Sequence, residues 1–335
     1  MKALLQKLLD REDLTEDEMV GAMTAIMEGE VAPAWVGGFL VALRMKGESV
    51  PELVGAARVM REKSHRVQMP EGPAVDTCGT GGDGADTFNI STTAAFVVAG
   101  AGVRVAKHGN RAVSSRAGSA DVLNALGVRL GVEQAVVERC LNEAGIGFLF
   151  APAFHPAMKD AAPVRKELGV RTLFNLLGPL TNPAGVPTQV VGVFADEWRQ
   201  PLAEALLALG CERAMVVHGE DGLDEITLTC ETRVSRLSKG KIKEKTIDPT
   251  EYGFSYCSEE DLAGGTAEDN ARILRETLDG AGGPRRDIVL LNAGAAIYTS
   301  GKADSLQEGI RLAEQSINSG AARQKLKDLC RITNE

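Results

Sequence analysis

The fold is decided by residues 76–84, which read Asp76-Thr77-Cys78-Gly79-Thr80-Gly81-Gly82-Asp83-Gly84. This run follows a short β-type stretch and, within a few residues, leads into a helix that begins near Asn89. Its four glycines in six positions permit positive φ angles and let backbone N–H groups approach a ligand closely. The N-terminus of the following helix adds free amides and a favourable dipole. The run therefore predicts an anion-binding turn between a strand and a helix.

Two familiar phosphate motifs match this run in part. Gly79, Gly81 and Gly84 satisfy G-x-G-x-x-G, but a dinucleotide site needs the helix to begin inside that pattern and an acidic residue about 20 positions later. Here the helix begins later, and residues 104–107 read Arg-Val-Ala-Lys. A Walker A loop is excluded, because Ala85-Asp86 stand where it needs Lys and then Ser or Thr. For this run alone, the alternative is a glycine-rich turn that binds nothing.

A second turn concentrates groups that bind anions. It follows the apolar strand predicted over residues 103–106, and residues 107–115 read KHGNRAVSS, with two cations, an imidazole, an amide and two hydroxyls. The chain then enters a helix for which Ser119 is a candidate cap. Such a cluster can bind a pyrophosphate from the side opposite the glycine run. Folding alone explains two such turns in succession poorly.

Outside these turns the chain divides into a helical part and an α/β part. Up to about Gln68 the pattern is helical, with helix starts at Thr15 and at residues 50–52. After a short linker, β-type runs alternate with helical ones, which is typical of an α/β domain with a largely parallel sheet. We therefore expect a small all-helical domain over residues 1–70 and a larger α/β domain over residues 71–335.

Two later segments carry predictions of their own. Residues 234–247, VSRLSKGKIKEKTI, indicate an exposed hairpin that turns at Lys239-Gly240, and we interpret its basic residues as a solvated face. Residues 287–301, DIVLLNAGAAIYTSG, indicate a final buried strand followed by a helix.

Composition narrows the classes of function. The net charge of -9, from 46 acidic and 37 basic residues, and an aromatic share of 4% disfavour binding to nucleic acid. No stretch approaches the roughly 20 apolar residues that span a bilayer, and the N-terminus is typical of an amphipathic helix, so we expect a cytoplasmic protein. The six cysteines show no CxxC spacing and no histidine at ligand spacing. Neither a zinc site nor a disulfide framework is indicated.

Taken together, residues 76–128 closely resemble the phosphoribosyl pyrophosphate (PRPP)-binding region of the anthranilate phosphoribosyltransferases. Residues 169–184, GVRTLFNLLGPLTNPA, and residues 218–227, HGEDGLDEIT, resemble further segments of that family. The resemblance extends from the helical N-terminus to the last helices. It implies an α/β fold of the nucleoside phosphorylase and phosphoribosyltransferase type, in which part of residues 165–187 joins the helical domain. It also implies transfer of phosphoribose from PRPP to anthranilate in tryptophan biosynthesis.

The resemblance implies a specific set of PRPP-binding residues. They are Gly79, Gly82, Asp83, Thr87, Asn89, Ile90, Ser91, Thr92, Lys107, His108, Gly109, Asn110, Arg111, Ala112, Val113, Ser114, Ser115 and Ser119. Ser91, Asp224 and Glu225 are implied as ligands of Mg²⁺, with two ions per subunit. Adjacent acidic residues are usually solvated when seen alone. A pyrophosphate leaving group, however, needs hard cations, and hard cations need carboxylate oxygens.

For anthranilate, the resemblance implicates Gly79, Asn110 and Arg165, with His108 and residues 155–156 as lining. Pro163 suits an early helical position, so the Arg165 guanidinium is expected to project from a helix toward the substrate carboxylate. On its own, an arginine in such a charged helix is usually a surface residue. The resemblance further implies a homodimer formed through the helical domain and a hinge motion between the two domains.

The chemistry and its alternatives follow from these residues. We expect no covalent intermediate and no catalytic base, because the sequence offers no nucleophile with a paired base and because an aromatic amine is already nucleophilic at pH 7. One alternative is a pyrimidine nucleoside phosphorylase on the same scaffold, which the KHGNR turn disfavours. The other is a noncatalytic relative that binds nucleic acid, which the net charge and the acidic pair disfavour.

Overall fold

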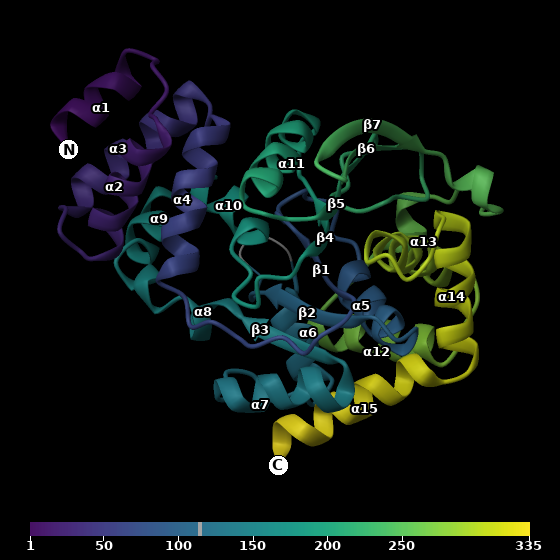
Figure 1. The fold of residues 1–335 in the computed structure, drawn as a ribbon. Helices are drawn as coiled ribbons and strands as arrows, with labels where there is room; N and C mark the ends of the chain where they lie inside the picture. The colour runs from purple at the N-terminus through teal and green to yellow at the C-terminus, as the bar shows by residue number, and fades with distance from the viewer. Residues whose placement is uncertain (113–115) are drawn as a thin grey trace.

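The computed structural model describes residues 1–112 and 116–335. The chain begins with four helices, which Figure 1 shows grouped at one end of the molecule: α1 (Lys2–Leu9), α2 (Glu16–Met27), α3 (Pro33–Lys46) and α4 (Val50–Glu62). Helix α2 starts where the sequence predicts, because the Thr15 hydroxyl accepts from the Glu18 N–H and the Glu18 carboxylate accepts from the Thr15 N–H. The expectation of a helical N-terminal domain in front of an α/β domain is confirmed.

Seven strands form one sheet in the order β3-β2-β1-β4-β5-β6-β7. They are β1 (Ala74–Gly79), β2 (Arg104–Gly109), β3 (Ile146–Phe150), β4 (Thr188–Gly192), β5 (Arg213–Gly219), β6 (Thr232–Ser238) and β7 (Lys241–Ile247). Strands β1 to β5 are parallel, and β6 and β7 form an antiparallel hairpin. The hairpin turns at Lys239-Gly240, where both φ angles are positive, at 52° and 69°. The expectations of a mostly parallel sheet and of this hairpin are therefore confirmed.

Helices cover both faces of the sheet (Figure 1). One core contains side chains of α5 (Ile90–Gly100), α6 (Ser119–Ala125), α12 (Ala267–Leu278), α13 (Pro284–Thr299), α14 (Leu306–Asn318) and α15 (Ala321–Asn334). A second core contains α11 (Arg199–Ala208) and the N-terminal helices. Neighbouring strand residues point to opposite cores: Val190 and Val217 belong to the first, and Val191 and Val216 to the second. Burial on both faces explains why β4 and β5 each contain two consecutive valines.

The N-terminal helices are tied to the rest of the chain by two later helices. Both α9 (Ala162–Leu168) and α10 (Leu173–Leu177) contribute to the core of the N-terminal helices, through Val164, Leu173 and Leu177 among others. From α4, the Arg61 guanidinium also reaches across, donating from Nε to the Leu180 carbonyl at 2.6 Å and from Nη1 to the Leu209 carbonyl at 3.1 Å. The exact domain boundaries remain a prediction.

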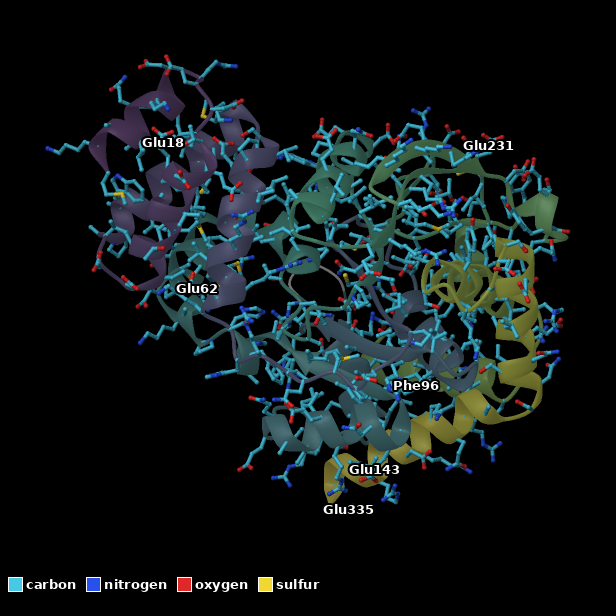
Figure 2. The ribbon with its side chains drawn as sticks, in the orientation of Figure 1. Glu18, Glu62, Phe96, Glu143, Glu231 and Glu335 are labelled. Atoms are coloured by element: carbon cyan, nitrogen blue, oxygen red, sulfur yellow. The ribbon has the colours of Figure 1, made fainter. Side chains whose placement is uncertain are left out.

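Short elements complete the chain. They are α7 (Gln134–Arg139), a π-helical turn (Cys140–Ala144), α8 (Ala151–Phe154) and the 3₁₀ turns Pro156–Lys159, Gly178–Leu180, Asp196–Trp198, Pro249–Tyr252 and Glu259–Leu262. Figure 2 shows Glu143 and Glu335 close together, where Arg139 and Arg331 each pair with both carboxylates. Within the described residues, no helix combines the length and the apolar character needed to cross a membrane.

Two expectations about local structure are wrong. Residues 287–301 contain no strand, because Pro284 starts α13, which continues to Thr299 and is buried on all sides between residues 288 and 297. A helix that is apolar all round cannot be distinguished from a buried strand by its hydrophobic pattern. Ser119 is not a cap but the first residue of α6, after Gly118, and its hydroxyl accepts from the Thr92 hydroxyl at 3.0 Å.

Candidate functional site

The candidate site lies at the edge of the sheet where the parallel strands end. Strand β1 is in the middle, with β2 on one side and β4 on the other, so the chain connections diverge at its carboxyl end. Ligands of open α/β sheets bind at such a divergence. The glycine run leaves β1 here, and residues 107–109 complete β2 beside it. The fold therefore brings the two predicted anion-binding turns together.

The glycine loop, residues 79–84, is held by several other segments. The Thr80 N–H donates to the Gly192 carbonyl at 2.9 Å, and the Gly81 N–H donates to Asp224 Oδ2 at 2.8 Å. The Arg171 guanidinium donates to the Gly82 carbonyl. Gly81 and Gly82 have φ angles of 65° and 78°, a left-handed conformation that favours glycine. The sequence therefore forms the open turn that it predicts, although its contacts come from distant residues.

The acidic pair crosses directly over the ends of β1 and β4. A Cβ atom on Gly79 would overlap Asp224 Oδ2, and one on Gly192 would overlap the Asp224 carbonyl oxygen. Both glycines are therefore required for Asp224 to approach the sheet. The neighbouring Glu225 accepts a hydrogen bond from the Ser91 N–H at 3.0 Å, at the start of α5. The structure thus places the three predicted metal ligands, Ser91, Asp224 and Glu225, beside the glycine loop.

These carboxylates are buried and repel one another. Burial, together with the charges of Asp83 and Glu225, raises the pKa of Asp224 well above its usual range. Burial also raises the pKa of Glu225 to about 7, although Lys107 opposes this increase. Such a site favours a cation that would offset the repulsion. Carboxylate and hydroxyl oxygens are the ligands that Mg²⁺ prefers, so the residues present fit this ion.

Lys107 lies at the centre of the site, with only 3% of the residue exposed. Its Nζ donates to the Thr77 carbonyl and lies 3.4 Å from the Ser91 hydroxyl. At the same end of α5, the Asn89 side chain donates to the Ala117 carbonyl at 3.1 Å. Ile90 is buried in the core beneath. The N-terminus of α5 is thereby joined to both turns.

The remaining predicted PRPP-binding residues lie around these groups. Thr87 forms an isolated bridge with Ala263, Asp83 Oδ2 accepts from the Asp224 N–H at 3.4 Å, and Thr92 contacts Ser119. Gly109 ends β2 and is followed by Asn110, Arg111 and Ala112. Val113, Ser114 and Ser115 lie outside the described residues.

The predictions from sequence missed Asp121, which closes the second turn at its base. Its carboxylate accepts from the Arg111 guanidinium at 2.8 Å and from the N–H groups of Ala112 and Gly118, both at 3.0 Å. An acidic residue three positions after Gly118 has capping-box spacing, which is a signal that could have identified it. Arg171 was also missed, and no pattern in the sequence singles it out.

Two histidines, His108 and His155, lie side by side. His108 follows Lys107 in β2, so its side chain points to the opposite face of the sheet. The rings of His108 and His155 are 5.2 Å apart between centroids, and burial lowers the pKa of His108 to about 3 and that of His155 to about 4. The Nδ1–H of His108 donates to the Gly178 carbonyl at 3.1 Å, while the Nε2 atoms of both rings are buried without a partner among the described residues. Both rings are therefore neutral at pH 7.

Arg165 comes from α9, as the sequence predicts. Its guanidinium lies over the Phe174 ring, 4.9 Å from the centroid, and burial lowers its pKa. Within the described residues the guanidinium forms no hydrogen bond and no ion pair, and it does not contact Gly79 or Asn110 through a hydrogen bond. A partly buried cation without an acidic partner is suited to an anionic ligand.

Two family models match the chain. The glycosyl transferase family helical bundle domain matches residues 2–64, and the glycosyl transferase family a/b domain matches residues 71–323. These two matches correspond to the helical and α/β parts of the fold.

Curated proteins and solved structures agree with this assignment. The chain is 57% identical to the anthranilate phosphoribosyltransferase of Laribacter hongkongensis, covering 99% of this chain and 97% of that protein. The Thermus thermophilus enzyme of the same name is 48% identical, with a TM-score of 0.94 and 99% of both chains covered. The Saccharomyces cerevisiae enzyme in complex with PRPP and Mg is 30% identical, with a TM-score of 0.90, covering 99% of this chain and 97% of that one. The resemblance noted in residues 76–128 is thereby confirmed, and the chain belongs to the anthranilate phosphoribosyltransferase family.

Proposed function

We propose that this protein transfers the phosphoribosyl group of PRPP to the amino nitrogen of anthranilate, which yields N-(5-phosphoribosyl)anthranilate and pyrophosphate in tryptophan biosynthesis. The observation that carries the proposal is the glycine loop held against a buried acidic pair and beside Lys107. This arrangement suits a pyrophosphate group together with a divalent cation. The relatives that bear this name, at 57% and 52% identity over nearly their full lengths, support the reaction.

PRPP is bound between the two turns. Its pyrophosphate lies against the glycine loop, with Gly79, Gly82 and Asp83, and near Lys107. Its remaining contacts come from the other PRPP-binding residues predicted from the sequence, which are Thr87, Asn89 to Thr92, His108 to Ser115 and Ser119. The N–H groups at the start of α5 and the charge of Lys107 stabilise the phosphate oxygens.

Mg²⁺ binds at Ser91, Asp224 and Glu225, with two ions per subunit. No group of three or more His, Cys, Asp or Glu side chains is placed to hold a metal ion by itself within residues 1–112 and 116–335. Mg²⁺ usually completes its octahedron with water and substrate phosphates, so this sparse set of protein ligands suits a metal that arrives with pyrophosphate. When bound, the ion neutralises the charge that develops on the leaving group. The yeast relative was solved in complex with PRPP and Mg, which supports this ion.

Anthranilate is bound on the side of Arg165. The unpaired guanidinium recognises the carboxylate, and Gly79 and Asn110 contact the same substrate. His108 and His155 are neutral and line the pocket, so they add no second positive charge that would compete for the carboxylate. The yeast relative in complex with 4-fluoroanthranilate supports a substrate of this class.

The chain promotes the reaction by positioning and by charge. Displacement at ribose C1 develops positive charge on the sugar and negative charge on the departing pyrophosphate. Lys107 and the loop amides stabilise the pyrophosphate as the C1–O bond breaks, and Arg165 orients the amine for attack as the C1–N bond forms. The surplus proton of the amine is released to water.

The protein acts as a cytoplasmic homodimer formed through the helical bundle. The neighbouring helices α1 and α3 expose Leu9, Val41 and Met45, at 63%, 36% and 71%. Apolar residues exposed together support an interface. All six cysteines are free thiols, which supports a reducing compartment. Sedimentation that gives a monomer at micromolar concentration would contradict the dimer.

The test of the reaction is the loss of anthranilate fluorescence when the purified protein is mixed with PRPP and Mg²⁺. We expect a loss that EDTA abolishes and that excess Mg²⁺ restores. The double variant Asp224→Asn, Glu225→Gln should fold and lose its dependence on Mg²⁺ together with its turnover. A folded wild-type protein that leaves the fluorescence unchanged would reject the proposed function, and phosphorolysis of a pyrimidine nucleoside would then be assayed.

A further inference from the structure

We propose that Arg171 is a positioning residue for the pyrophosphate group: its guanidinium holds the glycine loop in shape and places a fixed positive charge at the edge of that loop. The inference rests on the proposed function, because it names a further residue for the same site. Arg171 lies in the linker between α9 and α10.

The geometry around Arg171 is specific. Its Cζ lies 4.3 Å from the centroid of the Phe194 ring, so the planar guanidinium stacks on an aromatic face. From this position, Nη2 donates a hydrogen bond to the Gly82 carbonyl. A Cβ atom on Gly82 would lie 3.5 Å from both Nε and Nη2. The guanidinium therefore packs against the side of Gly82 where other residues carry a side chain.

Arg171 completes a set of contacts that holds three consecutive residues of the loop, Thr80, Gly81 and Gly82. The Phe194 N–H donates to the Thr80 hydroxyl at 3.0 Å, so the residue beneath the guanidinium also holds the loop. Thr80 and Gly81 are held from β4 and from the acidic pair, as described above. Among these contacts, the α9–α10 linker contributes the hydrogen bond to Gly82. Without it, the carbonyl of a glycine with positive φ loses its restraint.

The charge of Arg171 is a second reason to assign it to the pyrophosphate group. A guanidinium has five N–H donors and stays protonated at all working pH values. Arg171 is exposed, uses one donor on Gly82, and forms no ion pair with a carboxylate among the described residues. Its other donors form no hydrogen bond among the described residues and are available to a ligand. Planar donors of this kind bind phosphate oxygens well.

The linker also connects the residues proposed to bind anthranilate with the loop proposed to bind pyrophosphate. Arg165, proposed to bind the anthranilate carboxylate, belongs to the helix that precedes this linker, and Arg171 contacts the loop that is proposed to bind pyrophosphate. Arg165 and Arg171 therefore lie close together in the sequence, on α9 and in the linker that follows it. An effect of Arg171 on pyrophosphate alone would separate its role from that of Arg165.

The test compares Arg171→Met and Arg171→Lys with Arg272→Met. Arg272 is an exposed arginine of α12 that pairs with Asp269 and Glu276, so its substitution gives the same change of charge at a residue that forms no hydrogen bond with the loop among the described residues. A charge-assisted hydrogen bond contributes enough that we expect Arg171→Met to raise the KM for PRPP and the inhibition constant of pyrophosphate about tenfold. The KM for anthranilate should change less than twofold. Arg171→Lys should recover part of the loss, and Arg272→Met should match the wild type.

Several outcomes would overturn the proposal. One is an unchanged inhibition constant of pyrophosphate in Arg171→Met, and another is an equal loss for both substrates with a lower Tm, which would indicate a purely structural role. If Arg171→Met does not fold, the proposal is tested with Arg171→Lys and Phe194→Leu. Both should weaken pyrophosphate binding without changing the net charge. Calorimetry with pyrophosphate and Mg²⁺ measures this binding directly. That readout remains valid even if the wild type fails to consume anthranilate, so the two proposals can fail separately.

Discussion

Acid should destabilise this protein through two buried histidines. In the folded state, burial lowers the pKa of His108 to about 3 and that of His155 to about 4, from an ordinary value of 6.5. Between pH 6.5 and pH 4 the unfolded chain therefore binds protons that the folded chain does not. Stability is fully present above pH 6.5 and decreases as the pH falls toward 4. At pH 5 the loss relative to pH 8 is about 2 kcal/mol for each histidine, since one pKa unit corresponds to about 1.4 kcal/mol.

The assay is unfolding by guanidinium chloride at pH 8, 6.5 and 5, followed by the fluorescence of the two tryptophans. The wild type is compared with His108→Asn, His155→Asn and the double variant. Each substitution lowers stability at every pH by removing packed atoms, so only the change with pH is diagnostic. We expect the double variant to lose about 4 kcal/mol less than the wild type between pH 8 and pH 5.

The neighbouring charges define what the single variants should do. The charge of His155 contributes to the lowered pKa of His108, but both values lie below 5, so each single variant should remove about half of the change between pH 8 and pH 5. Buried Asp76, which accepts from the His108 N–H at 3.2 Å, has a raised pKa and therefore contributes the opposite pH dependence in all variants. If the wild type and the double variant lose stability in parallel from pH 8 to pH 5, the reasoning is refuted.

Three further predictions use other features. Glu48→Gln should stabilise the protein at pH 8 and less so at pH 4 in denaturant unfolding, because burial raises the pKa of the Glu48 carboxyl, whose oxygens have no partner within the described residues. Arg165→Met should raise the KM for anthranilate about tenfold or more while the KM for PRPP stays unchanged, and a parallel rise in both would count against its role. Gly192→Ala should destabilise by about 3 kcal/mol or prevent folding, because its Cβ would overlap the Asp224 carbonyl. Gly21→Ala in α2, where no atom lies within 4 Å, is the matched control and should stabilise slightly.

Local signals predicted the elements whose formation depends on neighbouring residues in the chain. The helix start at Thr15 and the Lys239-Gly240 turn formed as expected, since each needs only residues within a few positions. The same reasoning failed for α13, where burial on all sides removes the period that distinguishes a helix from a strand. Periodicity is thus informative only where one face of an element meets water.

Within the site, the composition of each turn was predictable, but the contacts between turns were not. The need for a glycine at position 192 arises only when Asp224, far along the chain, crosses the end of β4. The contact of Arg171 with Gly82 depends on where the α9–α10 linker lies, which no local pattern determines. The resemblance to a known family supplied residue assignments such as Asp224 and Glu225 that the spacing alone did not.

The arrangement of the acidic pair also explains why these contacts must come from distant segments. Buried carboxylates repel one another, and the raised pKa values of Asp224 and Glu225 indicate the free energy that their burial costs the folded protein without a cation. A flexible turn would relieve that repulsion by moving the carboxylates into water. Here Gly79 and Gly192 allow Asp224 to pack directly on the sheet, and the Ser91 N–H holds Glu225. The rigid parallel sheet therefore keeps in place an unfavourable cluster of acidic groups, which the proposed binding of a divalent cation and pyrophosphate would make favourable.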